Sequence, residues 1–128
     1  MKKLFIPALI TIIGLSGCTT TANFFELKPS TMEYSGNWTG AHQNVSVATL
    51  KIKQDGTGII CQDYSGIAKI VAIKKVQDKI YTQDGSFWKI KNINSDNMEL
   101  AYGMGGSYFL KKDDNFSLTT PACLEKLK

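Results

Sequence analysis

The sequence predicts an all-β protein, a small antiparallel up-and-down β-barrel of about eight strands, preceded by a signal peptide and a short tether. Two observations predict the barrel. Short runs rich in β-branched and aromatic residues recur about every ten residues from Tyr34 onward, and turn signals such as Asp55-Gly56 and Asp84-Gly85 separate them. Apolar and polar residues alternate within several runs, as in an antiparallel sheet with one face on a core. Closure into a barrel removes exposed sheet edges.

Residues 1–17 have the pattern of a signal peptide. Lys2 and Lys3 form a basic start, and the twelve residues Leu4–Leu15 form an apolar run interrupted by proline and glycine. A membrane-spanning helix needs about 20 apolar residues, so this run is too short to be a permanent anchor. The segment Leu15-Ser16-Gly17-Cys18 that follows resembles the lipobox of bacterial lipoproteins.

The lipobox resemblance implies cleavage before Cys18 and lipid on its thiol, with three acyl chains in the mature protein. Two or more chains give stable membrane attachment. Thr19 stands where inner-membrane lipoproteins of enteric type carry aspartate, so the resemblance favours the outer membrane of a bacterial cell envelope. The alternative is an ordinary secretory signal that is cleaved nearby, for instance after Ala22.

Removal of the first 17 of 128 residues leaves 111, enough for one small domain. We expect residues 18–30 to form the lipidated cysteine and tether, and residues 31–128 to form the barrel. Phe24 and Phe25 are the bulky apolar residues of the tether. They either dock onto the domain or dip toward the lipid surface.

The strands follow from the alternation and the turns between them. We expect them at Tyr34–Gly40, Val45–Lys53, Gly58–Tyr64, Ile67–Val76, Lys79–Gln83, Ser86–Asn92, Met98–Gly103 and Ser107–Lys112. Ala48, Leu50 and Ile52, for example, face one way while lysines between and after them face the other. Ile67–Val76 is apolar on both faces and is compatible with a helix, but its β-branched residues favour a strand.

The direction of Cys61 depends on the turn at Asp55-Gly56. A two-residue loop sets Cys61 opposite Leu50 on the core face, whereas a three-residue loop with a bulge sets Ile60 there instead. A slip of one residue turns every side chain to the other face, so both arrangements stay open.

Cys61 and Cys123 remain once Cys18 carries lipid. An even pair in a small exported domain usually forms a disulfide, because the compartment is oxidising. The bridge would close a loop of 63 residues, attach the tail Thr119–Lys128 to the domain, and stabilise it by roughly 4 kcal/mol. Two buried free thiols are the alternative.

The segment Gly36-Asn37-Trp38 matches the Gly-x-Trp opening of lipocalin-like small barrels, and Asp55-Gly56-Thr57-Gly58 resembles a turn common in bacterial domains of this kind. The resemblance implies that the Trp38 indole closes one end of the barrel. In that family an arginine stacks on this tryptophan, and the present sequence contains no arginine.

Composition argues against several chemistries. All 15 basic residues are lysines, scattered along the chain against 11 acids, so nucleic acid is not an expected partner. His42 is the one histidine and is expected in a solvated loop, without partners for a metal site or a nucleophile. Most aspartates lie in turns, where they normally bind their own backbone. We therefore expect no enzyme activity, no metal and no cofactor.

Aromatic residues offer the most candidates for binding. Trp38, Trp88, Tyr81 and Tyr102 are expected either to line a ligand cavity or to fill the core. A barrel of eight strands is just wide enough for side chains, which favours a filled core.

Three functions are compatible with these features. The first is a membrane-anchored envelope accessory or binding module with a protein partner in the envelope. The second is a lipocalin-type carrier of a small apolar ligand. The third is an inhibitor, because Ser86-Phe87-Trp88-Lys89 is similar to a stretch of the lysozyme-inhibitor lipoproteins whose serine and lysine enter the lysozyme cleft.

Overall fold

A computed structural model of the chain describes residues 21–128. The expected signal peptide and its recognition residues Leu15, Ser16 and Gly17 lie outside these residues, and so does the expected lipidation site, Cys18. The strands are β1 (Gly36–His42), β2 (Ser46–Ile52), β3 (Thr57–Tyr64), β4 (Ile67–Val76), β5 (Lys79–Thr82), β6 (Phe87–Ile93), β7 (Asn97–Ala101) and β8 (Ser107–Lys112). The helices are α1 (Thr21–Glu26) and α2 (Pro121–Leu127).

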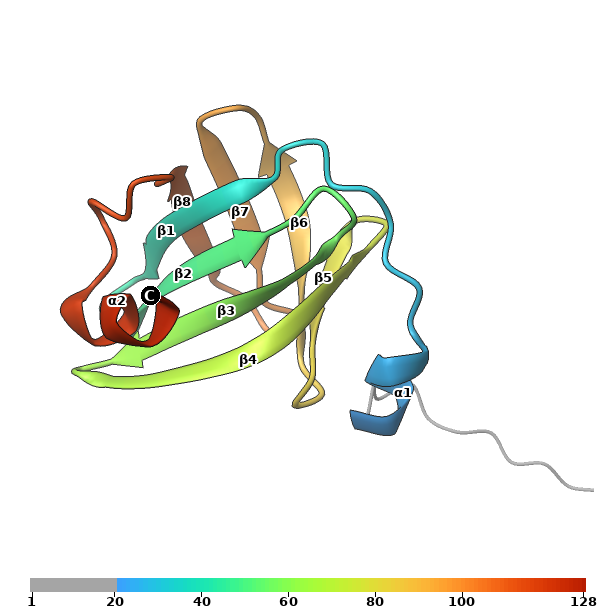
Figure 1. Ribbon diagram of the computed structural model, residues 1–128, viewed down its shortest axis with the longest axis horizontal. Coiled ribbons are helices and arrows are strands. Elements are labelled where there is room, and N and C mark those ends of the chain that lie inside the picture. Colours follow the sequence, from blue (N-terminus) through green and yellow to red (C-terminus); the bar gives the residue numbers. More distant parts are fainter. Residues whose placement is uncertain (1–20) are drawn as a thin grey trace, which may run out of the picture.

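The eight strands form one closed antiparallel barrel in chain order, with β1 paired to β8 (Figure 1). This confirms the predicted up-and-down barrel, and each strand lies within a few residues of its expected bounds. The segment Ile67–Val76 is a strand, β4, as its β-branched residues indicated. Neither helix of the described part is long or apolar enough to cross a bilayer.

Side chains fill the interior of the barrel. Those with no solvent exposure include Trp38, Leu50, Ile60, Ile80, Leu100 and Tyr108. The strand register pairs these residues across neighbouring strands, for example Leu50 with Ile60 and Leu100 with Tyr108, so their side chains share the inner face. Burial of a large apolar side chain contributes about 1.5–3 kcal/mol, so this shared face supplies most of the drive for folding.

One end of the barrel is closed around Trp38. Its Nε1 donates a hydrogen bond to the Tyr34 carbonyl oxygen (3.1 Å), and Met32 is buried beside it. Lys112, paired with Trp38 across β1 and β8, places its Nζ 5.3 Å from the centre of the indole ring. A lysine therefore occupies the position over this tryptophan where the lipocalin resemblance implies an arginine.

The β2–β3 turn decides the direction of Cys61. Lys53 N donates to Thr57 O (2.8 Å), which leaves three residues in the loop, and Gly56 adopts a φ of +89° that favours glycine. The register pairs Leu50 with Ile60, so Cys61 points out of the barrel. The three-residue alternative is therefore the one adopted, and the two-residue alternative is wrong.

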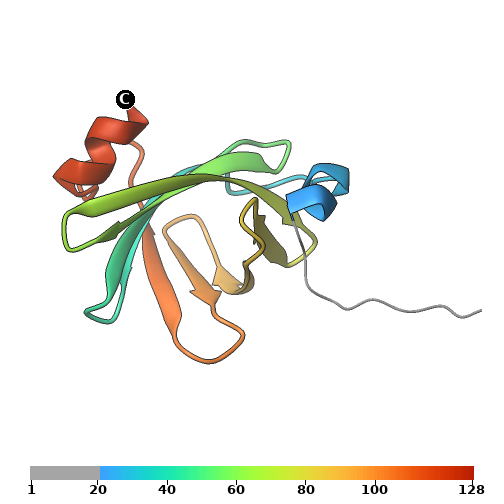
Figure 2. The ribbon, with the colours of Figure 1, turned by 90° about the horizontal axis from the view of Figure 1, so that it is seen from below.

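On the outer wall Cys61 is bonded to Cys123 of α2, which confirms the predicted disulfide. Figure 2 shows α2 outside the barrel, over β3 and β4. The sequence analysis did not predict this helix, although Thr120-Pro121 is a start signal. Thr120 caps it by accepting a hydrogen bond from Cys123 N (3.3 Å).

Asp113 attaches the chain before α2 to the barrel. Its carboxylate is buried and accepts hydrogen bonds from Thr39 Oγ1 (2.7 Å), Thr119 Oγ1 (2.8 Å) and Leu118 N (3.0 Å). Burial alone raises the pKa of Asp113, but these hydrogen bonds outweigh it and hold the pKa below its ordinary value. Asp113 thus has a structural role, and it joins residues far apart in the chain.

Candidate functional site: the mouth of the barrel

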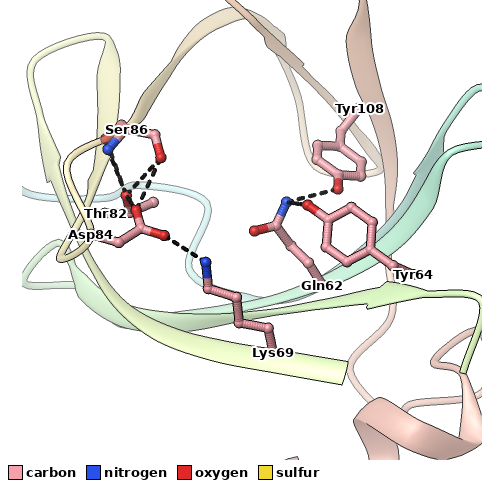
Figure 3. A network of polar contacts seen from close by, with 7 residues as sticks. All are labelled: Gln62, Tyr64, Lys69, Thr82, Asp84, Ser86 and Tyr108. Carbon is pink, nitrogen blue, oxygen red and sulfur yellow. Dashed lines mark hydrogen bonds and ion pairs between the residues drawn. The ribbon is translucent and has the colours of Figure 1, made fainter. Parts of the chain in front are cut away.

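The end of the barrel opposite Trp38 is lined by polar side chains. Figure 3 shows most of them, which come from β3, β4, β8, the end of β5 and the β5–β6 turn. We call the following set the mouth network: Ser46, Gln62, Tyr64, Lys69, Thr82, Asp84, Ser86 and Tyr108. Each of its strand residues continues the inward-facing row of its strand, so the core becomes polar where the strands end.

Gln62 organises one side of the mouth network. Its Nε2 donates to the hydroxyl oxygens of Tyr64 (2.9 Å) and Tyr108 (3.0 Å), while the Tyr108 hydroxyl shares a further hydrogen bond with Ser46 Oγ. Tyr108 has no solvent exposure and Tyr64 is 40% exposed. These hydrogen-bonded side chains therefore extend from the packed interior to the solvent. Burial raises the pKa of the Tyr64 hydroxyl.

Asp84 organises the other side. It accepts hydrogen bonds from Thr82 Oγ1, from Ser86 Oγ (3.0 Å) and from Lys69 Nζ (2.9 Å), the last being an ion pair. Burial raises the pKa of Asp84, but the three hydrogen bonds and the lysine charge outweigh it and lower the pKa to about 2. The hydrogen bond to Asp84 also raises the pKa of Lys69. Both groups are charged at neutral pH.

The pairing between β4 and β5 covers only four of the ten residues of β4. The two strands pair from Ile73 to Val76, and Gln83 N donates to Ala72 O (2.9 Å) just beyond. Residues 67–71 extend past the end of β5, and no strand among residues 21–128 pairs with them on that side. The Lys69–Asp84 ion pair joins the two sides of this gap (Figure 3). Ile67, at its edge, is 75% exposed.

Aromatic rings pack beneath the mouth network. The His42 ring lies 4.6 Å from that of Tyr102, and Trp88 makes edge contacts with Tyr102 (5.7 Å) and Tyr108 (6.0 Å), all between ring centres. The expectation of a solvated loop histidine is wrong, because β1 continues to His42 and its half-buried ring contacts the mouth tyrosines.

The four aromatic candidates occupy three different places. Trp38 lies at the closed end, while Trp88 (2% exposed) and Tyr102 lie beneath the mouth. Tyr81 follows the buried Ile80 along β5, so its side chain lies on the outer face, with its ring centre 5.6 Å from that of Phe87. Trp38 and Trp88 are packed in the core, and the four residues do not form one site.

Sequence analysis did not single out Gln62 or Lys69, and it treated Asp84 as a turn residue. The available signal was a polar side chain at an inward position of a strand. That signal is readable only once the register is known, because Gln62 is followed by the polar Asp63, and Lys69 lies in a strand that is apolar on both faces, between Ala68 and Ile70.

The inhibitor-like stretch does not present its serine and lysine together. Ser86 belongs to the mouth network, whereas the Lys89 side chain extends along the outer face to Asp78 (3.9 Å) in the β4–β5 turn, at the other end of the barrel. Trp88 between them is buried.

An eight-stranded up-and-down barrel closed at one end by the tryptophan of a Gly-x-Trp segment has the architecture of a lipocalin. The family model described as "Bacterial lipocalin LPS transport optimiser YedD" matches residues 21–127, and the chain belongs to this family. No curated protein matches the chain. Among solved structures it is similar to a lipocalin lipoprotein affecting virulence in Streptococcus pneumoniae, with a TM-score of 0.54 and 16% identity over 67% of this chain and 98% of that one. At this identity the likeness concerns the fold.

Proposed function

We propose that this protein is a lipid-anchored lipocalin of the bacterial outer membrane that supports LPS transport by binding another envelope protein through its mouth. The lipobox at Leu15-Ser16-Gly17-Cys18 supports the anchor. The description of the family supports a role in LPS transport.

The filled interior of the barrel is the main observation that favours a protein partner over a bound lipid. Trp38, Leu50, Ile60 and Tyr108 have no exposed surface, and they come from strands around the barrel. A ligand with acyl chains would have to displace several of them, at a cost of several kcal/mol for each large side chain. The rim of the mouth exposes the apolar Ile67 and the aromatic Tyr64 beside the charged Lys69, and protein interfaces combine aromatic and apolar contacts with a polar rim.

The same geometry supports a non-enzymatic role. Asp84 is the carboxylate of the mouth network, and its hydrogen bonds and ion pair lower its pKa to about 2. A general acid or base works best with a pKa near the operating pH. The surroundings of Asp84 therefore suit a fixed ion pair and not proton transfer.

A complementation experiment tests the function. In a strain lacking the gene, we would measure how fast newly labelled LPS reaches the outer membrane after supplying the wild type, Cys18→Ala, Ile67→Asp or Phe109→Asp. Ile67 is 75% exposed at the mouth and Phe109 is 64% exposed on the outer wall, so both variants should fold. We expect the first two variants to fail and Phe109→Asp to restore transport.

If Ile67→Asp restored LPS transport as well as the wild type does, that result would contradict binding through the mouth. Native mass spectrometry of the purified protein provides the second measurement. A stoichiometric lipid retained by the folded protein would instead support the carrier function.

A further inference from the structure

Two adjacent phenylalanines of α1 have opposite surroundings. Phe24 is 3% exposed and Phe25 is 62% exposed. Lys74 of β4 holds the helix in place, because its Nζ donates to Phe24 O (2.9 Å) and Leu27 O (3.0 Å) and lies 4.8 Å from the centre of the Phe24 ring. With Phe24 buried against the barrel, the neighbouring ring of Phe25 points into solvent.

The chain after α1 is also bound to the barrel. Ser30 N donates to Lys75 O (2.8 Å), Lys75 Nζ donates to Thr31 O (2.9 Å), and Met32 N donates to Gln54 O (2.8 Å). Gln77 N donates to Ser30 Oγ (2.9 Å). The segment from Phe24 to Met32 therefore behaves as part of the barrel and not as a free linker.

These contacts limit the distance between barrel and membrane. Cys18 precedes Phe24 by six residues, and a fully extended chain covers about 3.3–3.6 Å per residue, or roughly 20 Å in total. If lipid on Cys18 anchors the chain, α1 must lie within that distance of the bilayer. An exposed phenylalanine there gains free energy by entering the lipid.

The docking site of α1 also determines which end of the barrel faces the bilayer. Lys74 and Lys75 lie next to the β4–β5 turn, whereas Ile67 at the mouth is seven residues back along β4, about 23 Å away. Figures 1 and 2 both show α1 and the β3–β4 hairpin at opposite ends of the molecule.

We propose that α1 is a membrane-contact element in which Phe24 binds the barrel and Phe25 enters the lipid, so that the barrel is held with the β4–β5 turn toward the bilayer and its mouth directed away. This inference rests on the lipid anchor of the proposed function. In this arrangement the exposed Phe25 side chain contacts the bilayer, and the mouth stays accessible to a protein.

Fluorescence quenching tests the arrangement. The full-length lipidated protein would be reconstituted into vesicles of phosphatidylethanolamine and phosphatidylglycerol with brominated acyl chains, which quench tryptophan only at short range. Phe25→Trp places a reporter on α1. Phe109→Trp is the matched control, since Phe109 is similarly exposed (64%) and pairs with Ala41 at the mouth end of β1. The native Trp38 and Trp88 are buried and give the same background in both variants.

We expect the brominated lipid to quench most of the fluorescence of the introduced tryptophan in Phe25→Trp. In Phe109→Trp we expect it to quench none of that fluorescence. Vesicle-bound protein with no loss at position 25, or with equal loss at position 109, would overturn the orientation and leave the anchor intact. Protein that fails to float with the vesicles would contradict the lipid anchor, and the orientation would fall with it.

Discussion

Lys69 Nζ and Asp84 Oδ2 lie 2.9 Å apart and join β4 to the β5–β6 turn along the stretch where β4 has no strand partner on that side within residues 21–128. The pair is partly exposed, and such pairs contribute at most about 1 kcal/mol to stability. Its effect is therefore local, because it holds the free half of β4 against the rest of the barrel.

Replacement of Lys69 tests this local effect. We expect Lys69→Met to lower the free energy of unfolding by no more than about 1 kcal/mol while speeding amide hydrogen exchange in residues 67–71. Lys89→Met is the matched control, since Lys89 is also exposed and contacts an aspartate, Asp78, on the outer face. Equal exchange in the two variants would show that the ion pair does not hold β4.

Acid should weaken the mouth network. The folded-state pKa of Asp84 is about 2, below its ordinary value of 3.8. The ionised carboxylate therefore stabilises the fold above pH 4, and this stabilisation is lost as the pH falls from about 4 toward 2. We expect the difference in melting temperature between the wild type and Asp84→Asn to shrink as the pH falls from 5 to 2. The turn variant Asp96→Asn serves as the control. A difference that stays constant over this range would contradict the role of the charge.

The disulfide should stabilise the fold by restricting the unfolded chain. Cys61 and Cys123 are 62 residues apart, and closure of a loop of this size is worth about 4 kcal/mol. We expect reduction, or the Cys61→Ser/Cys123→Ser double variant, to lower the free energy of unfolding in urea by this order. A melting temperature that does not change on addition of reductant would indicate free thiols and would refute the bridge.

The core tryptophans distinguish a packed interior from a ligand cavity. Trp38 is fully buried and Trp88 is 2% exposed, so we expect Trp→Ala at either position to cost about 3–5 kcal/mol in urea unfolding. Phe109→Ala, on the outer wall, should cost far less. Stable Trp→Ala variants together with saturable quenching of wild-type tryptophan fluorescence by a fatty acid would support a carrier.

Lys112 should be replaceable by arginine without loss of stability. We expect Lys112→Met to cost about 1 kcal/mol, because it removes the cation over Trp38 and the ion pair with Asp114 (3.3 Å). Lys112→Arg keeps both interactions and should retain wild-type stability in thermal melts. A loss as large as that of the methionine variant would show that the charge over the indole contributes nothing.

Local features of the sequence determined most of the barrel. Alternation and turn residues placed all eight strands, since a strand's inward face and a glycine's positive φ depend on residues close in the chain. Cysteine parity indicated the disulfide, and the Gly-x-Trp segment identified the closed end.

Tertiary structure decided what depends on register and on distant contacts. A single extra residue in the β2–β3 loop turned Cys61 outward, and the same register brought Gln62 and Lys69 into the mouth. Asp84, 15 residues from Lys69 in the chain, contacts it from the turn that follows the short strand β5. The docking of Phe24 depends on Lys74, 50 residues away. The sequence pattern specifies which face a side chain occupies on its strand, but closure of the barrel decides which side chains meet, because that depends on the length and pairing of every strand.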